Sequence, residues 1–138
     1  MPKILVIDDD SEIRSLIACV LELEGHTVVV AEDGIKGVAR HRAERPELVI
    51  TDMVMPKQGG AETIIKIRRE VPDALIIAIS GGARFGDTHP LIDARKLGAT
   101  DTLHKPFTVS ELTDCVARSL NRTSSPNTPT LLGFAPGS

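Results

Sequence analysis

The sequence predicts an α/β fold, (βα)5, in which helices cover both faces of a doubly wound parallel sheet of five strands. Four short runs rich in Ile, Leu and Val are nearly continuous rather than alternating, which is typical of strands buried on both faces, and a short fifth strand is expected after them. Between them, apolar residues recur every three or four positions, which is typical of helices. Strands alternating with helices form right-handed crossovers. A length of 138 residues suits one domain and is too short for an eight-fold barrel.

The first half of the chain is expected to contain three strands, each followed by a helix. Asp10 or Ser11 can cap the first helix, and Glu24-Gly25 ends it. Arg45-Pro46 breaks the second helix. The expected strands are residues 3–7, 26–31 and 49–52, and the expected helices are residues 11–24, 35–43 and 61–70. The residues expected to face the core from these helices are Ile13, Leu16, Ile17 and Val20, then Ile35, Val38 and Ala39, then Ile64, Ile65 and Ile67.

The second half is expected to contain the other two strands. The fourth strand covers residues 74–79 and ends in Ser80, and a polar loop over 81–89 and a helix over 91–97 follow it. The fifth strand covers residues 100–104. A last helix starts at Thr108 or Ser110, and the residues expected to form its apolar face are Val109, Leu112, Val116 and Leu120.

The composition changes near the end of the chain. From Asn121 onward Pro, Ser and Thr predominate, which is typical of disordered segments. We therefore expect a domain over residues 1–122 and a disordered tail over residues 123–138, with no output domain. The alternative is that the tail is a docking peptide, which would use Leu131, Leu132 and Phe134.

Composition also excludes several classes of function. The net charge of -3 and the lack of a basic stripe argue against nucleic-acid binding. Trp and Tyr are absent, so there are few side chains on which bases or a flavin would stack. No apolar run reaches membrane-spanning length, and the start lacks the layout of a signal peptide, so we expect a cytoplasmic protein with no membrane contact. Cys19 and Cys115 are expected to be reduced core residues, with a regulatory disulfide as the alternative.

Chemically active side chains stand at the carboxyl ends of four expected strands. Asp8 and Asp9 end the first strand, Asp52 the third, Ser80 the fourth and Lys105 follows the fifth. Open α/β sheets bind their ligands at this edge. At about 4 Å and an effective dielectric constant near 20, each pair of carboxylates costs roughly 4 kcal/mol. Either one carboxyl group stays protonated or a cation lies between them, and an oxygen-only set suits Mg²⁺ rather than zinc.

This set of groups suits phosphoryl transfer. Asp52, central and alone on its strand, is the best candidate nucleophile and would form an acyl phosphate. Lys105 and the metal would neutralise the phosphoryl oxygens, and Ser80 would donate a hydrogen bond to one of them. Taken singly, the acidic run could be a solvated cap, Ser80 a turn residue and Lys105 a surface lysine. All of them lie at the carboxyl ends of expected strands, and this shared position favours a phosphoryl-transfer site over the three separate interpretations.

These residues resemble the receiver domain of two-component response regulators, of the chemotaxis-receiver type. The resemblance extends from Lys3 to about Arg122. It implies a flavodoxin-like strand order 2-1-3-4-5 and a cis Lys105-Pro106 bond. The segments that carry it are Ile4-Leu-Val-Ile-Asp8-Asp9, Ala31-Glu-Asp-Gly34, Asp52-x-x-Met55-Pro56 with Gly60, Ile79-Ser80-Gly81, Leu97-Gly98-Ala99-Thr100-Asp101 and Lys105-Pro106-Phe107.

The resemblance also implies roles for the site residues. Asp52 would accept a phosphoryl group from a histidine kinase or a histidine phosphotransfer protein. Asp9, Asp52 and the backbone carbonyl of Val54 would bind Mg²⁺, and Asp8 would bind it through water. Ser80 and Lys105 would be the switch hydroxyl and the phosphate-binding lysine.

The sequence departs from the family pattern in three ways. Thr102 stands where the family usually has Tyr or Phe, so its aromatic switch is missing or replaced by Phe85. The interval from Ser80 to Lys105 is longer than usual, with the extra residues expected in the loop after Ser80. Val54 and Gly82 stand at the positions that tune loss of the phosphoryl group, and neither can orient an attacking water. We therefore predict slow self-dephosphorylation.

The expected function is that of a stand-alone response regulator, not an enzyme, which signals by phosphorylation-dependent protein binding. Its partner surface would include residues 91–97, residues 100–104 and the last helix, and would bind another protein or a second copy as a homodimer. The alternative is a phosphorylation-independent interaction module, which the missing aromatic favours. A phosphatase of the haloacid-dehalogenase type would use Asp8-Asp9-Asp10 but needs more chain and leaves Asp52 unexplained. A flavodoxin-like redox protein lacks its phosphate loop and aromatic stackers here.

Overall fold

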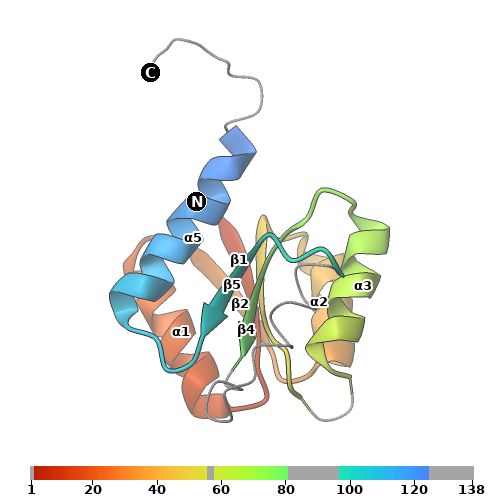
Figure 1. The fold of residues 1–138 in the computed structure, drawn as a ribbon, viewed down its shortest axis with the longest axis horizontal. Coiled ribbons are helices and arrows are strands. Elements are labelled where there is room, and N and C mark those ends of the chain that lie inside the picture. Colours follow the sequence, from red (N-terminus) through yellow and green to blue (C-terminus); the bar gives the residue numbers. More distant parts are fainter. Residues whose placement is uncertain (1, 56–57, 81–96, 125–138) are drawn as a thin grey trace.

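The fold is a five-stranded parallel sheet between two pairs of helices, shown by a computed structural model that describes residues 2–55, 58–80 and 97–124 (Figure 1). The strand order is β2-β1-β3-β4-β5, which confirms the predicted fold class. The strands are β1 Lys3–Ile7, β2 Thr27–Ala31, β3 Leu48–Asp52, β4 Leu75–Ser80 and β5 Asp101–His104. The helices are α1 Ser11–Leu23, α2 Gly34–Glu44, α3 Gly60–Glu70 and α5 Val109–Ser124.

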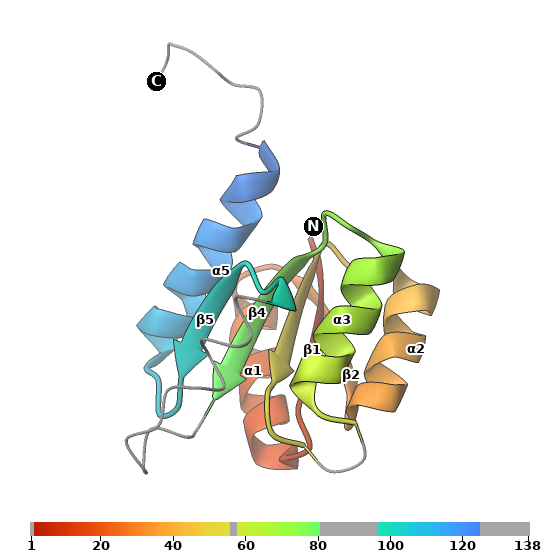
Figure 2. The ribbon, with the colours of Figure 1, turned by 45° about the vertical axis from the view of Figure 1, so that its right-hand side comes forward.

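Parallel pairing places all the carboxyl ends of the strands at one edge of the sheet. Ile7 pairs with Ala31 and Thr51, and Asp52 pairs with Ile79. Ser80 pairs with His104. The strands all run the same way in Figure 2, so the residues that follow them come together at this edge.

The sheet separates two apolar cores. Leu5 and Ile7 of β1 belong to the core under α2 and α3, whereas Ile4 and Val6 belong to the core under α1 and α5. Figure 1 shows the two helix pairs on opposite faces of the sheet. All four side chains are fully or almost fully buried, which explains why the strand runs are continuously apolar instead of alternating.

The first helix begins with a side-chain cap and has a different apolar face from the one expected. Asp10, and not Ser11, is the cap, since its Oδ1 accepts hydrogen bonds from the amides of Glu12 and Ile13 at 2.9 and 3.3 Å. Ile17 is buried as expected, but Leu16 is 51% exposed and Leu21 is buried in its place. Cys19 is exposed, so its prediction as a core residue was wrong.

The apolar face predicted for α2 was mostly wrong. Val38 is buried, but Ile35 is 57% exposed and Ala39 is also exposed. The helix instead meets the sheet through glycine: a Cβ added to Gly37 would lie 2.5 Å from Cδ1 of Ile7. Periodicity of apolar side chains does not detect a contact that depends on the absence of a side chain.

The other described helices agree better with the sequence. In α3, Ile64 and Ile67 are buried and Ile65 is half-buried. In α5, the residues expected in the core are buried or half-buried except Val109, which lies at the first position of the helix and is 57% exposed. Cys115 is buried there as expected. The helix ends at Ser124, two residues beyond the expected domain boundary.

Three predictions fall on parts of the chain outside the described residues. They are the loop over 81–89 with its proposed aromatic Phe85, nearly all of the helix over 91–97, and the tail from 125 onward. Among the described helices, none combines the length and apolar character that crossing a membrane requires.

His41 lies buried in α2 and gives the stability of the fold a predictable pH dependence. Burial lowers its pKa from the ordinary value of 6.5, with nearby Arg45 acting in the same direction and Glu70 against it. The unfolded chain therefore takes up this proton at a higher pH than the folded chain does.

We expect the contribution of His41 to be fully present above about pH 6.5 and to be lost as the pH falls toward the lowered pKa of the folded state. The slope from one proton cannot exceed about 1.4 kcal/mol per pH unit. Urea unfolding between pH 5 and 8 would show it. The slope should shrink in His41→Gln, but not in the control His104→Gln, whose side chain is exposed. An unchanged slope in His41→Gln would contradict the assignment.

Candidate functional site

The predicted site residues lie together at the carboxyl edge of the sheet. We call Asp8, Asp9, Asp52 and Lys105 the acidic edge. Asp8 and Asp9 follow β1, Asp52 ends β3, and Lys105 follows β5. The carboxylates of Asp8, Asp9 and Asp52 each offer one oxygen within 4.8 Å of the others. Asp8 and Asp52 are buried, while Asp9 is exposed.

Backbone hydrogen bonds of Met53, to β4 and to the start of α3, hold the strand end that carries Asp52. The amide of the next residue, Met53, donates to the carbonyl of Ile79 at 2.9 Å, and the amide of Gly60 donates to the carbonyl of Met53 at 3.0 Å. A Cβ on Gly60 would lie 2.6 Å from the Cα of Met53, so α3 begins where only glycine fits. The amide of Val54 donates to Asp52 Oδ1 at 3.4 Å.

Lys105 brings positive charge between two carboxylates. Its Nζ lies 3.1 Å from Oδ2 of Asp52 and 3.4 Å from Oδ2 of Asp8. Burial alone would lower the pKa of Lys105, but the charges of Asp52 and Asp8 outweigh burial and raise it. The ammonium therefore stays charged. The Lys105-Pro106 bond is cis, as expected.

Ser80 is anchored beside this lysine. It ends β4, is buried, and its carbonyl accepts a hydrogen bond from the amide of Lys105 at 2.8 Å. Its neighbour Ile79 pairs with Asp52 across β3 and β4. The sheet register thus brings Ser80 to the same edge as Asp52 and Lys105.

The carboxyl group of Asp8 is buried close to a second buried carboxyl group, that of Asp52. Burial raises the pKa of Asp8, and the charge of Asp52 acts in the same direction, against the opposing hydrogen bond from the Asp10 amide and the charge of Lys105. The Asp10 amide donates to Oδ1 at 2.9 Å. Oδ2 is buried and accepts no hydrogen bond from the described residues. One lysine does not compensate three clustered carboxylates, so the edge favours a further cation.

The donor set fits a hard divalent cation. All three groups are carboxylates, and Mg²⁺ prefers oxygen ligands, typically one or two carboxylates with water and phosphate oxygens. Zinc sites usually include Cys or His, and this cluster has neither. The buried Oδ2 of Asp8 already lies 3.4 Å from the Lys105 ammonium, so a metal ion bound through this oxygen would share it with the lysine. The roles of the Val54 carbonyl and of individual ligands remain predictions.

Sequence reasoning missed one group that supports this edge. Arg14 of α1 donates from Nη1 to the backbone carbonyl of Asp8 at 2.7 Å. The sequence did contain a signal for this contact, because an arginine in the first turn of a helix lies beside the strand end that precedes the helix. The hydrogen bond from Arg14 connects α1 to the loop that carries Asp8 and Asp9.

Five parallel strands in this order, with carboxylates and a lysine at their carboxyl edge, define a receiver-type α/β domain. The chain belongs to the response regulator receiver domain family, whose model matches residues 4–117. A solved receiver domain protein from Clostridium thermocellum is 34% identical, with a TM-score of 0.83 over 90% of this chain and 98% of that chain. A CheY-like receiver domain protein from Methanospirillum hungatei is 25% identical, with a TM-score of 0.84 over 91% of this chain and 98% of that chain.

Curated relatives are longer than this chain. The DNA-binding dual master transcriptional regulator RpaA of Synechocystis is 38% identical over 89% of this chain and 51% of its own length. The transcriptional regulatory protein CpxR homolog of Haemophilus influenzae is 36% identical over 92% of this chain and 54% of its own length. The chain thus spans about half the length of the curated relatives it matches.

Proposed function

We propose that Asp52 accepts a phosphoryl group from a histidine kinase or a histidine phosphotransfer protein, with Mg²⁺ at the acidic edge. One observation carries this proposal: Lys105 lies 3.1 Å from Asp52 and 3.4 Å from Asp8. The lysine thus places a positive charge beside the carboxylate that would receive an anionic group. A structural ion pair would need one carboxylate, whereas this edge gathers three.

In the proposed reaction, one carboxylate oxygen of Asp52 attacks the phosphorus of the donor. The P–O bond to Asp52 forms as the P–N bond of the donor phosphohistidine breaks, and the imidazole leaves with the electron pair. Lys105 stabilises charge on the transferred oxygens, and the Ser80 hydroxyl donates to one of them. Asp8, Asp9, Asp52 and the Val54 carbonyl would hold Mg²⁺, which when bound neutralises charge on the phosphoryl oxygens.

The proposed protein is a regulator and not an enzyme, because Asp52 itself ends as the phosphorylated product. Its return requires a water oxygen to attack phosphorus, which releases inorganic phosphate and restores the carboxylate. Val54 lies two residues after Asp52 and is 69% exposed. Its apolar side chain cannot hold a water for this attack, so the phosphorylated form should be long-lived.

We expect Val54→Asn to accelerate loss of the phosphoryl group about tenfold, since one new hydrogen bond to the attacking water would lower the barrier by about 1.4 kcal/mol. Intact-mass measurements after removal of the donor give the decay rate. Val54→Ala, which shortens the side chain without adding an amide, serves as the control and should decay like wild type. A wild-type half-life of seconds would contradict the prediction.

The surroundings of the acidic edge favour a protein as phosphodonor. Val54, two residues from Asp52, and Val109, four residues from Lys105, are among the large apolar side chains most exposed to solvent, at 69% and 57%. Exposed apolar side chains beside a site are typical of surfaces that bind another protein. We also propose that the protein is cytoplasmic, as expected from the sequence.

The output we propose is phosphorylation-dependent protein binding, through stabilisation of a conformer that is already populated. A second candidate output is transcriptional regulation, which the names of the relatives and the match to about half of their length favour. In that case a part of the protein beyond the receiver would contact DNA, since this chain has a net charge of -3.

The test is intact mass after incubation with acetyl phosphate, with and without Mg²⁺. We expect one added phosphoryl group that requires Mg²⁺ and is removed by hydroxylamine, as an acyl phosphate would be. Absence of an adduct with acetyl phosphate and with phosphorylated histidine kinases would reject the proposal. It would favour the phosphorylation-independent interaction module, for which Thr102 in place of the usual aromatic is the supporting observation.

A further inference from the structure

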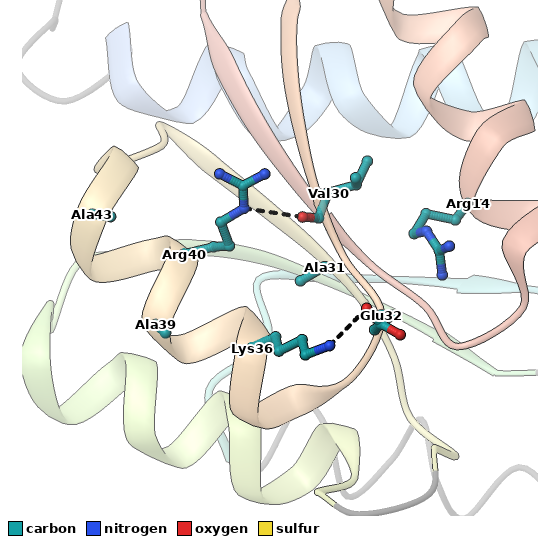
Figure 3. Close-up of a pocket in the computed structure, with 8 residues that line it drawn as sticks. All are labelled: Arg14, Val30, Ala31, Glu32, Lys36, Ala39, Arg40 and Ala43. Atoms are coloured by element: carbon teal, nitrogen blue, oxygen red, sulfur yellow. Dashed lines mark hydrogen bonds and ion pairs between the residues drawn. The ribbon is translucent and has the colours of Figure 1, made fainter.

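A groove of about 600 Å³ lies between α1 and α2, over the outer edge of β2 (Figure 3). Its volume falls within the range of about 300–1,000 Å³ that is usual for small-molecule sites. Arg14 reaches it from α1, and Lys36 and Arg40 reach it from α2. It does not include the acidic-edge residues, so a ligand bound there would not contact the transferred phosphoryl group.

The lining combines an apolar floor with an excess of positive charge. The apolar lining residues are Val30, Ala31, Ala39 and Ala43. The charged ones are Arg14, Lys36 and Arg40 against the single carboxylate of Glu32, a balance of three positive charges and one negative. The whole chain carries a net charge of -3. The groove lining therefore carries a net positive charge, also when Glu44 beside Arg40 is included, and this charge complements an anion.

Three contacts show how the two cations of α2 are held. Lys36 is paired with Glu32 at 2.8 Å, and Arg40 donates from Nε to the carbonyl of Val30 at 3.2 Å. Nη1 of Arg40 also pairs with Glu44, which does not line the groove, at 3.4 Å. Because β2 is an edge strand, the guanidinium on this carbonyl obstructs the addition of a further strand from another protein. A small molecule suits the groove better than a peptide strand.

We propose that this groove binds a small amphipathic anion, with a flat apolar body on the alanine floor and a carboxylate, sulfonate or phosphate between Arg14 and Arg40. Guanidinium groups suit this ligand because they bind anions through several N–H donors and also stack on flat rings. The bond from Arg14 to Asp8 uses one of its five donors.

The probe for the experiment is 1-anilinonaphthalene-8-sulfonate, an aromatic anion that fluoresces in apolar surroundings, titrated into the full chain without phosphodonor. We expect saturable binding to one site. Arg14→Gln and Arg40→Gln should each weaken it about tenfold or more, since a hydrogen bond to a charged group is lost. Ala43→Leu should weaken it similarly by filling the floor. Ala43 is exposed on a helix, so this variant should keep the fold, as circular dichroism would verify.

The matched controls are an Arg→Gln and an Ala→Leu substitution outside the groove. Arg69→Gln on α3 and Ala117→Leu on α5 change exposed side chains outside the groove and should leave probe binding unchanged. Equal losses in the controls and in the groove variants, or no saturable binding, would overturn the proposal.

Competition distinguishes the sources of the anion. Displacement of the probe by adenosine monophosphate would indicate a phosphate-bearing ligand, and displacement by benzoate a carboxylate-bearing one. Displacement by inorganic phosphate at the same concentrations would show that the apolar floor contributes nothing, and would overturn the amphipathic assignment.

The bond between Arg14 and the Asp8 carbonyl links the groove to the acidic edge. If the proposed function holds, a saturating competitor should change the initial rate of phosphorylation by acetyl phosphate at least twofold in wild type and not in Ala43→Leu. An unchanged phosphorylation rate despite measured binding would overturn the link between the groove and the acidic edge. Absence of any phosphoryl adduct in wild type would contradict the proposed role of Asp52 and would not bear on the groove.

Discussion

Replacing Asp52 by Asn is expected to abolish phosphorylation while leaving the fold intact. The amide has the same shape as the carboxylate but is not a nucleophile toward phosphorus. It also removes one of three clustered negative charges, which would relieve the repulsion that helps raise the pKa of Asp8. Intact mass after incubation with acetyl phosphate and Mg²⁺ should show no adduct, a loss of at least about a thousandfold in rate, since no alternative group reproduces the nucleophile.

The control for this change is Asp73→Asn, a carboxyl group in an exposed turn away from the acidic edge. It should accept the phosphoryl group at the wild-type rate. An adduct of undiminished yield on Asp52→Asn would show that another residue is the acceptor, with Asp9 the next candidate because it is exposed at the same edge. Urea unfolding should show that Asp52→Asn remains folded, with a stability change within about 1–2 kcal/mol.

The second large effect is expected from Gly60→Ala. A Cβ at this position would lie 2.6 Å from the Cα of Met53 and would also meet the carbonyl oxygen of Asp52. Both are backbone atoms of the strand end, so relief requires α3 to move away from β3. Overpacking of this kind costs about 1–3 kcal/mol. Urea unfolding should show the loss of stability, and phosphorylation should slow because the same movement displaces Asp52.

The neighbouring glycine provides the control. Gly59 precedes α3 as its N-cap, makes no side-chain cap bond, and a Cβ there would approach no closer than 3.4 Å to the Met53 carbonyl. Serine is favoured at this position, so Gly59→Ser should be neutral or slightly stabilising. If Gly59→Ser and Gly60→Ala lowered the stability equally, replacement of any glycine in this segment would explain the loss, and the close approach at Gly60 would not.

The positions of the first four strands could be predicted because burial on both faces leaves a continuous apolar signal, whereas the strand order came from the resemblance to receiver domains. Helix faces were less predictable. Leu16, Ile35 and Val109 are apolar residues at helical spacing that the structure leaves more than half exposed. Close contacts with the sheet and its strand ends also occur at Gly37 of α2 and Gly60 of α3, which an apolar pattern does not reveal. Hydrophobic patterns report where apolar side chains occur, but not which side of a helix another element will cover.

The acidic edge was more predictable than the helix faces because it depends on strand ends alone. Once five parallel strands are assigned, Asp8, Asp52 and Lys105 must meet at one edge, and the observed distances of 3.1 and 3.4 Å agree. Arg14 was missed because its contact is with a backbone carbonyl, so only its position in the first turn after the acidic strand end could have indicated the contact. The groove was missed for a similar reason, since alanines in a helix look the same whether they line a floor or face solvent.

The small number of large buried side chains in α2 has a consequence for local unfolding. Among the buried residues of this helix, two are glycines, and Val38 and His41 are the larger ones, whereas β1, β3 and β4 contribute nearly all of their side chains to the cores. Regions with few buried apolar contacts open at lower free energy than the rest of a domain. Amide hydrogen exchange should therefore be faster in α2 than in the central strands. The helix would open while Asp8, Asp52 and Lys105, which β1, β3 and β5 carry, keep their positions.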